Sequence, residues 1–228
     1  MASFDELINK PKRKRRDPVE LDSWLMKSLD DSLSEEGRPP RKGVFYPTAL
    51  GSRCDRYLYN CFHGLVKPEI ISGNTQRIFD NGNYLGERYD VYFKKMRCLL
   101  QTEAPLTSTN PPISGRLDFL IQHPKYGPTI VELKSINDNG FERLTRPKPE
   151  HFIQIQIYLA IAKRDYGIVL YENKNTQNVK AFLVPRSEEE WNEIVERCKF
   201  IMNLDSQPIV CKGYKFCACQ REWTNDNL

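Results

Sequence analysis

The sequence has no long hydrophobic run. No uncharged apolar stretch in its 228 residues approaches the roughly 18 residues that a membrane-spanning helix requires, so we expect no membrane association. The first residues, MASFDELINKPKRKRR, also lack the apolar segment of a secretory signal. We therefore expect a cytoplasmic, reducing location, where disulfides are a poor explanation for the seven cysteines.

Neither sign of charge dominates. The chain has 34 basic and 30 acidic residues and a net charge of +4, an excess too small to indicate nucleic-acid binding by itself. Basic side chains do gather between Lys10 and Arg16. Such a run is typical of a solvated arm, and it can also contact phosphates without sequence preference.

A change in composition near residue 43 predicts two parts. Asp17 or Asp22 can cap a short helix that carries Trp24 and other apolar residues at helical spacing. The segment GRPPRKG then supplies linker residues. We therefore predict a basic arm with a short helix over residues 1–43 and one main domain over residues 44–228.

The main domain has a mixed order of predicted elements, at a composition of 39% hydrophobic and 28% charged residues that is typical of globular proteins. Hydrophobic periodicity and turn residues predict an α/β fold. The predicted helices are 48–61, 75–96, 150–163 and 187–203, and the predicted strands are 98–106, 113–122, 128–136, 167–172 and 178–184.

Two carboxylates and a lysine flank a predicted hairpin at QHPKYGPT. Asp118 ends the segment Gly-Arg-Leu-Asp before the turn, and Glu132 and Lys134 follow it in Val-Glu-Leu-Lys. Side chains alternate along a strand, so Glu132 and Lys134 share a face that Asp118 of the neighbouring strand can reach. Adjacent carboxylates favour a hard cation such as Mg²⁺ or Mn²⁺, although Glu-x-Lys alone is also a common surface ion pair.

Polar residues also follow one face of the next predicted helix. Gln154 and Tyr158 are four positions apart, and His151 lies one turn earlier. Isoleucines and leucines cover the other faces, which is typical of a helix that packs on a sheet and turns a polar edge to a cleft. Taken alone, the pair is more often a tolerated polar edge without function.

Together these motifs resemble the PD-(D/E)xK nuclease superfamily, in particular its RecB-like exonuclease branch with iron–sulfur members, over about residues 45–220. The resemblance implies a restriction-endonuclease-like core, a mixed central sheet flanked by helices. It also implies that Asp118, Glu132 and the Leu133 carbonyl bind the catalytic metal and that Lys134 is the catalytic lysine.

The resemblance extends to the helices on either side. His-Phe-Ile-Gln154-Ile-Gln-Ile-Tyr158 looks like the Q-x-x-x-Y motif, whose members orient the site and the DNA. Related sequences often carry a metal-binding histidine in the helix before the first strand, where this chain has Gly86. Glu87 is a candidate substitute, although one residue along a helix turns a side chain by about 100°.

Four cysteines form a candidate metal site. Cys54 precedes the core, whereas Cys211, Cys217 and Cys219 follow it. RecB-like iron–sulfur nucleases have this one-plus-three layout, which implies a [4Fe–4S] cluster that joins the two ends of the domain. Four thiolates also suit zinc, and free buried thiols are the third alternative.

We therefore expect a metal-dependent deoxyribonuclease, with exonuclease action on DNA ends taken from the resemblance. DNA recombination, repair and phage DNA processing are the candidate processes, and a helicase or recombination protein is a candidate partner. The alternative is a noncatalytic DNA-binding or assembly module on a degenerate nuclease fold, and Gly86 is the residue that motivates it.

Overall fold

The computed structural model describes residues 21–52, 54–209, 217 and 219. Its centre is a five-stranded sheet with the order β3-β4-β5-β6-β7. Only β5 and β6 run parallel within this sheet, and the other neighbours are antiparallel. The strands are β3 (Leu99–Thr109), β4 (Pro112–His123), β5 (Gly127–Ile136), β6 (Tyr166–Asn173) and β7 (Val179–Pro185).

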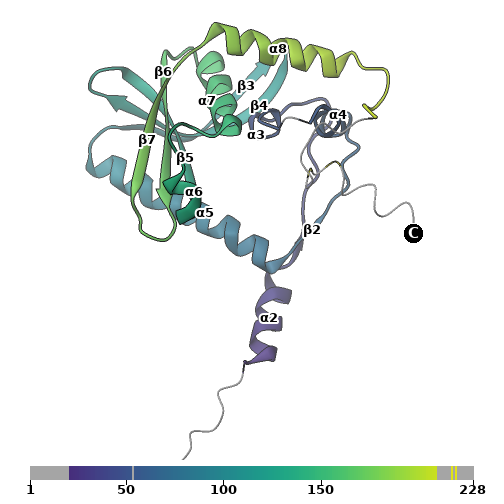
Figure 1. Ribbon diagram of the computed structural model, residues 1–228, viewed down its shortest axis with the longest axis vertical. Helices are drawn as coiled ribbons and strands as arrows, with labels where there is room; N and C mark the ends of the chain where they lie inside the picture. Colours follow the sequence, from purple (N-terminus) through teal and green to yellow (C-terminus); the bar gives the residue numbers. More distant parts are fainter. Residues whose placement is uncertain (1–20, 53, 210–216, 218, 220–228) are drawn as a thin grey trace, which may run out of the picture.

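Helices cover both faces of the sheet (Figure 1). Helix α5 (Gly73–Lys95) buries an apolar stripe on one face, where Tyr89 and Phe93 pack with Phe119. Helix α7 (Pro149–Ala162) covers the other face with Ile155 and Leu159. Outside α7 lie α3 (Pro47–Leu50), α4 (Asp55–His63) and α8 (Glu188–Met202). The predicted α/β class with a mixed, helix-flanked sheet is therefore confirmed.

The β4–β5 connection is the predicted tight hairpin. The ladder starts at His123 and Gly127, and Gly127 has a φ of +70°, a left-handed conformation that glycine adopts without steric cost. The hairpin fixes the register of β4 against β5. It therefore also fixes which residues of the two strands lie side by side further along.

One predicted helix was wrong. Residues 48–61 form two helices, α3 and α4, because the chain turns through an extended Cys54 with φ −99° and ψ 107°. The Cys54 sulfur accepts the Tyr57 N–H and caps α4. A short helix, α6 (Asp138–Glu142), was not predicted at all.

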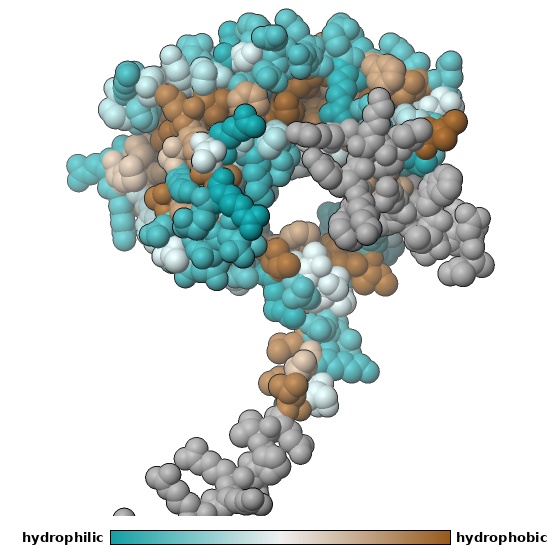
Figure 2. Space-filling model, viewed as in Figure 1, coloured by the Kyte–Doolittle hydropathy of each residue, from teal (hydrophilic) through white to brown (hydrophobic). Residues whose placement is uncertain are grey.

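The segment before the sheet contains a helix, α2 (Ser23–Leu33), which Asp22 caps through the Leu25 N–H at 2.9 Å. Asp30 pairs with Arg77 of α5, and β1 (Glu35–Glu36) pairs with β2 (Ile70–Ile71). Figure 2 shows apolar residues exposed on α2. The exposed large hydrophobic side chains of this helix are Trp24, Leu25, Met26 and Leu29. The division at residue 43 stays a prediction. Among the described helices, none has the length and apolar character needed to cross a membrane.

Candidate functional site

Strands β4 and β5 separate at the predicted motif. Their ladder runs from the hairpin to the pair Phe119 and Val131. Just past that pair, the Asp118 Oδ2 accepts the backbone N–H of Leu133 at 2.8 Å. The carboxylate therefore lies between the two strands, where it takes the place of a backbone acceptor. Asp118 is held next to β5 by this bond, as the sequence predicted for the two motifs.

Glu132 and Lys134 lie beside this fork on one face of β5. They pair in register with Val169 and Tyr171 of β6, and the Lys134 Nζ is 2.6 Å from the Glu132 Oε1. Glu132 is only 1% exposed. Burial, and then the charge of Asp118, raise the pKa of Glu132 to about 8 against the opposing effect of Lys134. Burial also raises the pKa of Asp118. Metal-free, the site holds two carboxylates that disfavour joint ionisation.

The donor set at the fork fits a hard divalent cation. The Glu132 Oε2 is buried and has no hydrogen-bond partner among the described residues, an arrangement that is costly unless another group satisfies the oxygen. A cation would satisfy that oxygen and neutralise the charge shared with Asp118. Oxygen ligands of this kind are the ones that Mg²⁺ and Mn²⁺ prefer.

Gln154 and Tyr158 brace the fork from α7. The Gln154 Nε2 donates to the Tyr158 hydroxyl at 3.2 Å, and that hydroxyl donates to the Arg116 carbonyl of β4 at 3.0 Å. Gly115 makes this approach possible, because a Cβ there would lie 3.0 Å from the Tyr158 ring and 2.8 Å from Pro47. The glycine of Gly-Arg-Leu-Asp is therefore a packing requirement, and Tyr158 contacts the backbone two residues before Asp118.

His151 lies at the other side of Lys134 and is bonded to Tyr171. Its Nδ1 is 2.7 Å from the Tyr171 hydroxyl, which also accepts the Lys148 N–H at 2.9 Å. Because the Tyr171 hydroxyl oxygen accepts the hydrogen bond from the Lys148 N–H, its own O–H can donate a hydrogen bond to the His151 Nδ1. Burial, and then Lys134 and Lys148, lower the pKa of His151 to about 3. His151 is therefore neutral at physiological pH.

This environment predicts a pH dependence of stability. A histidine whose folded pKa lies below its unfolded value of 6.5 stabilises the protein above pH 6.5, and that contribution is lost as the pH falls below it. We expect the parent protein to lose about 1–2 kcal/mol more unfolding free energy than His151→Asn between pH 7 and pH 5. Urea unfolding at both pH values measures the difference. Identical losses in the two proteins would contradict the assignment.

Asp118 and Lys134 open into a cavity of about 960 Å³ between α5 and the sheet. The α5 wall of this cavity includes Gly82 and Gly86, one helical turn apart, and a Cβ at either position would meet nothing within 4 Å. Glu87 lines the same cavity. Among the described side chains, however, the carboxylates of Glu87, Asp118 and Glu132 are not gathered into a mutually adjacent ligand group. The role of Glu87 as a substitute metal ligand stays a prediction.

Solved structures with a similar chain path exist. The structure of SSO0001 aligns with a TM-score of 0.52 and 19% identity, over 81% of this chain and 85% of that chain. The complex of LHK-Exo with dAMP aligns with a TM-score of 0.52 and 16% identity, over 70% and 86% of the two chains. The alkaline exonuclease LHK-Exo from Laribacter hongkongensis gives a TM-score of 0.51 and 12% identity, over 77% and 90%. No protein-family model and no curated protein sequence matches the chain.

The chain shares its mixed α/β fold with these solved structures, the alkaline exonuclease LHK-Exo among them. At these identities the likeness concerns the fold. In this fold the strand fork brings together residues that the sequence motifs indicated: Asp118 on β4 and Glu132 and Lys134 on β5, with Gln154 and Tyr158 of α7 next to them. Of these, Asp118 and Lys134 line the cavity.

Three of the four predicted cysteine ligands come together at a second site. The Cys219 sulfur is 3.3 Å from the sulfur of Cys54 and 3.3 Å from that of Cys217, and all three lie within 4.8 Å of one another. These separations exceed the roughly 2.05 Å of a disulfide bond. Three adjacent thiols could hold a metal ion. Cys211 lies outside the described residues.

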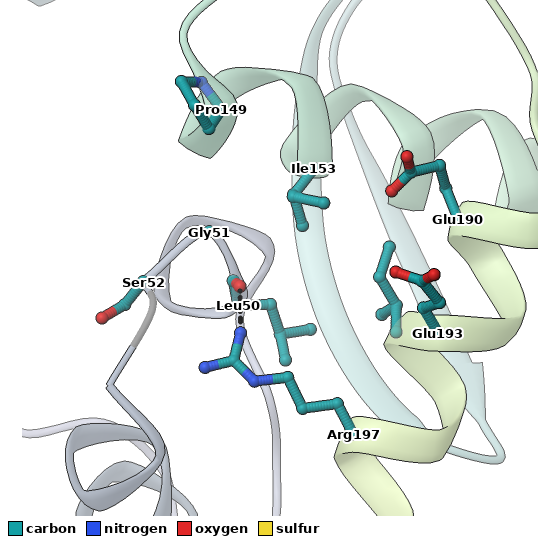
Figure 3. Close-up of a pocket in the computed structure, with 9 residues that line it drawn as sticks. Leu50, Gly51, Ser52, Pro149, Ile153, Glu190, Glu193 and Arg197 are labelled. Carbon is teal, nitrogen blue, oxygen red and sulfur yellow. Dashed lines mark hydrogen bonds between the residues drawn. The ribbon is translucent and has the colours of Figure 1, made fainter. Parts of the chain in front are cut away.

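Helix α8 holds the start of α4, and therefore Cys54, against the core. Figure 3 shows Arg197 of α8 beside a cavity of about 300 Å³, where its guanidinium donates to the Leu50 carbonyl at 3.1 Å. The same group pairs with Asp55 at 2.9 Å, directly after Cys54. This arrangement fixes the first predicted cysteine ligand while the other two arrive from the C-terminal segment.

Sequence reasoning missed a polar cluster beside the fork. The Glu172 carboxylate of β6 is buried, pairs with Arg88 and accepts the Tyr89 hydroxyl at 3.0 Å. Arg88 and Tyr89 are on α5, more than 80 residues away in the chain. The available signal was a charged residue at the end of an otherwise apolar strand, Tyr-Gly-Ile-Val-Leu-Tyr-Glu.

Proposed function

We propose that the protein is a metal-dependent nuclease that hydrolyses phosphodiester bonds in DNA, working as an exonuclease at DNA ends. The observation that carries the proposal is the buried, partnerless Glu132 Oε2 beside Asp118 and Lys134 at an open cavity. Two structures that share the fold are titled as an alkaline exonuclease and as its complex with dAMP, and they favour an exonuclease over other nucleases.

The Asp118 and Glu132 carboxylates and the Leu133 carbonyl would hold Mg²⁺ or Mn²⁺. When bound, such a cation polarises the phosphoryl oxygen and offsets the charge that develops during displacement. The hydrogen bond that the Leu133 N–H donates to Asp118 orients that carboxylate before a metal binds. The hydrogen bond from the Tyr158 hydroxyl to the Arg116 carbonyl joins α7 to β4 next to this carboxylate.

Lys134 is the candidate catalytic residue. Lys134 lines the cavity, and its ammonium group lies 2.6 Å from the Glu132 carboxylate. From there it can orient the attacking water and stabilise negative charge on the phosphate.

The cysteine site would hold a [4Fe–4S] cluster or zinc through Cys54, Cys217, Cys219 and Cys211. We place the activity inside the cell, in DNA recombination, repair or phage DNA processing, with a helicase or recombination protein as the partner that exposes DNA ends. The basic run from Lys10 to Arg16 supports contact with phosphates outside the cavity.

A second candidate function is a noncatalytic DNA-binding or assembly module. Gly86 favours it, because the position where related sequences often carry a metal-binding histidine offers no side chain to the cavity. This candidate predicts DNA binding that salt weakens, together with no cleavage at any Mg²⁺ or Mn²⁺ concentration.

Lys134→Ala should lower the cleavage rate by about 10²–10³-fold, the range observed when one stabilising donor is removed from a transition state. The measurement uses anaerobically purified protein with end-labelled linear DNA and closed circular DNA, in Mg²⁺ or Mn²⁺. Lys94→Ala is the matched control, since Lys94 pairs with Asp90 at the surface. It should cleave at the parent rate.

The two substrates separate the alternatives. Loss of cleavage in Lys134→Ala alone supports the nuclease, and survival of the circle supports exonuclease action. Equal cleavage by Lys134→Ala and the parent protein would show that the assignment is wrong. DNA binding without cleavage by the parent protein would favour the noncatalytic module.

A further inference from the structure

A second cavity adjoins the catalytic one. It has a volume of about 400 Å³ and lies between α5 and the end of β6. Leu85 of α5 and Ser135 of β5 line both cavities, and Ser135 directly follows Lys134. The two cavities therefore adjoin along β5, one residue past the candidate catalytic lysine. A polymer bound across the strand fork has this space for the unit next to the reacting one.

The lining of the second cavity combines three kinds of group. Tyr84 presents a ring that is 66% exposed, Asn81 and Gln177 supply side-chain amides, and Lys174 supplies a positive charge. Aromatic rings on which bases stack, together with cations along the backbone, are the devices by which proteins bind single-stranded nucleic acids. Amides can pair with the polar edges of a base.

The acidic group in this cavity does not oppose a phosphate. Glu172 is buried, and both of its oxygens are engaged, Oε1 by Arg88 and Oε2 by the Tyr89 hydroxyl. The ion pair also fixes the α5 backbone next to Tyr84 against β6. The wall that carries the aromatic ring is therefore held in place before a ligand arrives, which reduces the ordering cost of binding.

The size of the cavity limits what it can take. A volume of about 400 Å³ falls in the range of pockets that enclose one small molecule. One nucleotide of a single strand is a ligand of this size.

We propose that the cavity formed by Tyr84, Asn81, Lys174 and Gln177 binds one nucleotide of a single DNA strand, next to the scissile phosphate, with its base stacked on Tyr84. The position next to the scissile phosphate rests on the proposed nuclease function. The site makes single-stranded DNA, or the frayed strand at a DNA end, the substrate class.

The test measures DNA binding in a Lys134→Ala background, where the DNA stays intact. Fluorescence anisotropy compares a labelled single-stranded oligonucleotide with the same sequence as a blunt duplex. Tyr84→Ala should weaken single-strand binding about fivefold or more, because one stacked base contributes about 1–3 kcal/mol. Tyr84→Phe should bind within about twofold of its parent, since the ring is kept.

Tyr92→Ala is the matched control. Tyr92 is an exposed tyrosine on the same helix, at 43% exposure, and it lines neither cavity. It should bind single strands as its parent does. Thermal unfolding of each variant checks that the fold is kept, as expected for a residue that is 66% exposed. Tyr84→Leu, which keeps a helix-forming apolar side chain but has no ring for a base to stack on, is the second variant and should lose single-strand binding as Tyr84→Ala does.

Unchanged binding in Tyr84→Ala would overturn the inference, and so would an equal loss in Tyr92→Ala or in Tyr84→Phe. Because the readout is binding, it is separate from the proposed nuclease function. A parent protein that cleaves no DNA but binds single strands through Tyr84 would reject the nuclease and keep the nucleotide site. DNA cleavage that depends on Lys134, together with single-strand binding that does not change in Tyr84→Ala, would keep the nuclease and reject the nucleotide site.

Discussion

Asp118→Asn should abolish metal-dependent DNA cleavage without unfolding the protein. The asparagine oxygen can still accept the Leu133 N–H, so the strand fork is kept. The change removes one negative charge from the cation site, where metal coordination contributes several kcal/mol to the stabilisation of the transition state. We expect the cleavage rate to fall by at least about 10³-fold, and Mn²⁺ affinity to fall with it.

Asp90→Asn is the control for this prediction. Asp90 lines the same cavity, but its carboxylate accepts from Thr102 and pairs with Lys94. Calorimetric titration with Mn²⁺ and initial cleavage rates should leave Asp90→Asn near the parent protein. Lys134→Ala, in contrast, should lose cleavage but keep Mn²⁺ binding. Parent-like rates in Asp118→Asn would remove Asp118 from the metal site.

Most of the fold could be predicted because its buried elements carry clear periodicity. Strand β5 was expected over 128–136 and spans Gly127–Ile136, because apolar and polar residues alternate from Val131 to Lys134. Helix α7 was expected from residue 150 and begins at Pro149, because proline is favoured in the first turn and its ring fixes the backbone there. Local chemistry was sufficient in both places.

The break between α3 and α4 could not be read from the sequence. Cysteine is not among the residues that normally cap helices, yet the Cys54 sulfur accepts the Tyr57 N–H. The capping conformation also places Cys54 near Cys219, 165 residues away. A contact at that separation depends on the finished fold, so helical periodicity alone extended one helix through the turn.

In the candidate site, too, some neighbours could be predicted from spacing along the chain, whereas other contacts depend on the finished fold. Spacing along one strand placed Glu132 and Lys134 together, and a hairpin placed Asp118 nearby. The bond from Leu133 to Asp118 depends on how the strands separate, and the contact of His151 with Tyr171 joins a helix to a strand. Tyr171 is fully buried in an apolar strand, so its sequence context indicated only a core residue.

Cys54→Ser should remove the metal from the cysteine site and lower the stability of the protein sharply. Serine is a good helix cap, so α4 keeps its first hydrogen bond and the effect isolates the thiolate. A ligand that binds only the folded state stabilises it by about 4 kcal/mol at a thousandfold excess over its Kd. We expect a loss of at least this size, together with loss of bound metal.

Metal analysis after anaerobic purification and thermal unfolding with and without a chelator measure both effects. Cys198→Ala is the control, because Cys198 is a fully buried thiol on the core-facing side of α8, and burial raises its pKa to about 12. It should keep its metal and lose only the packing of one small side chain.

Iron with visible colour would identify the iron–sulfur cluster, and colourless zinc the alternative. If Cys54→Ser contains the parent amount of metal and unfolds at the parent temperature, the three adjacent thiols are not a metal site, and the contact of Cys54 with Cys219 serves only to pack the two ends of the domain together.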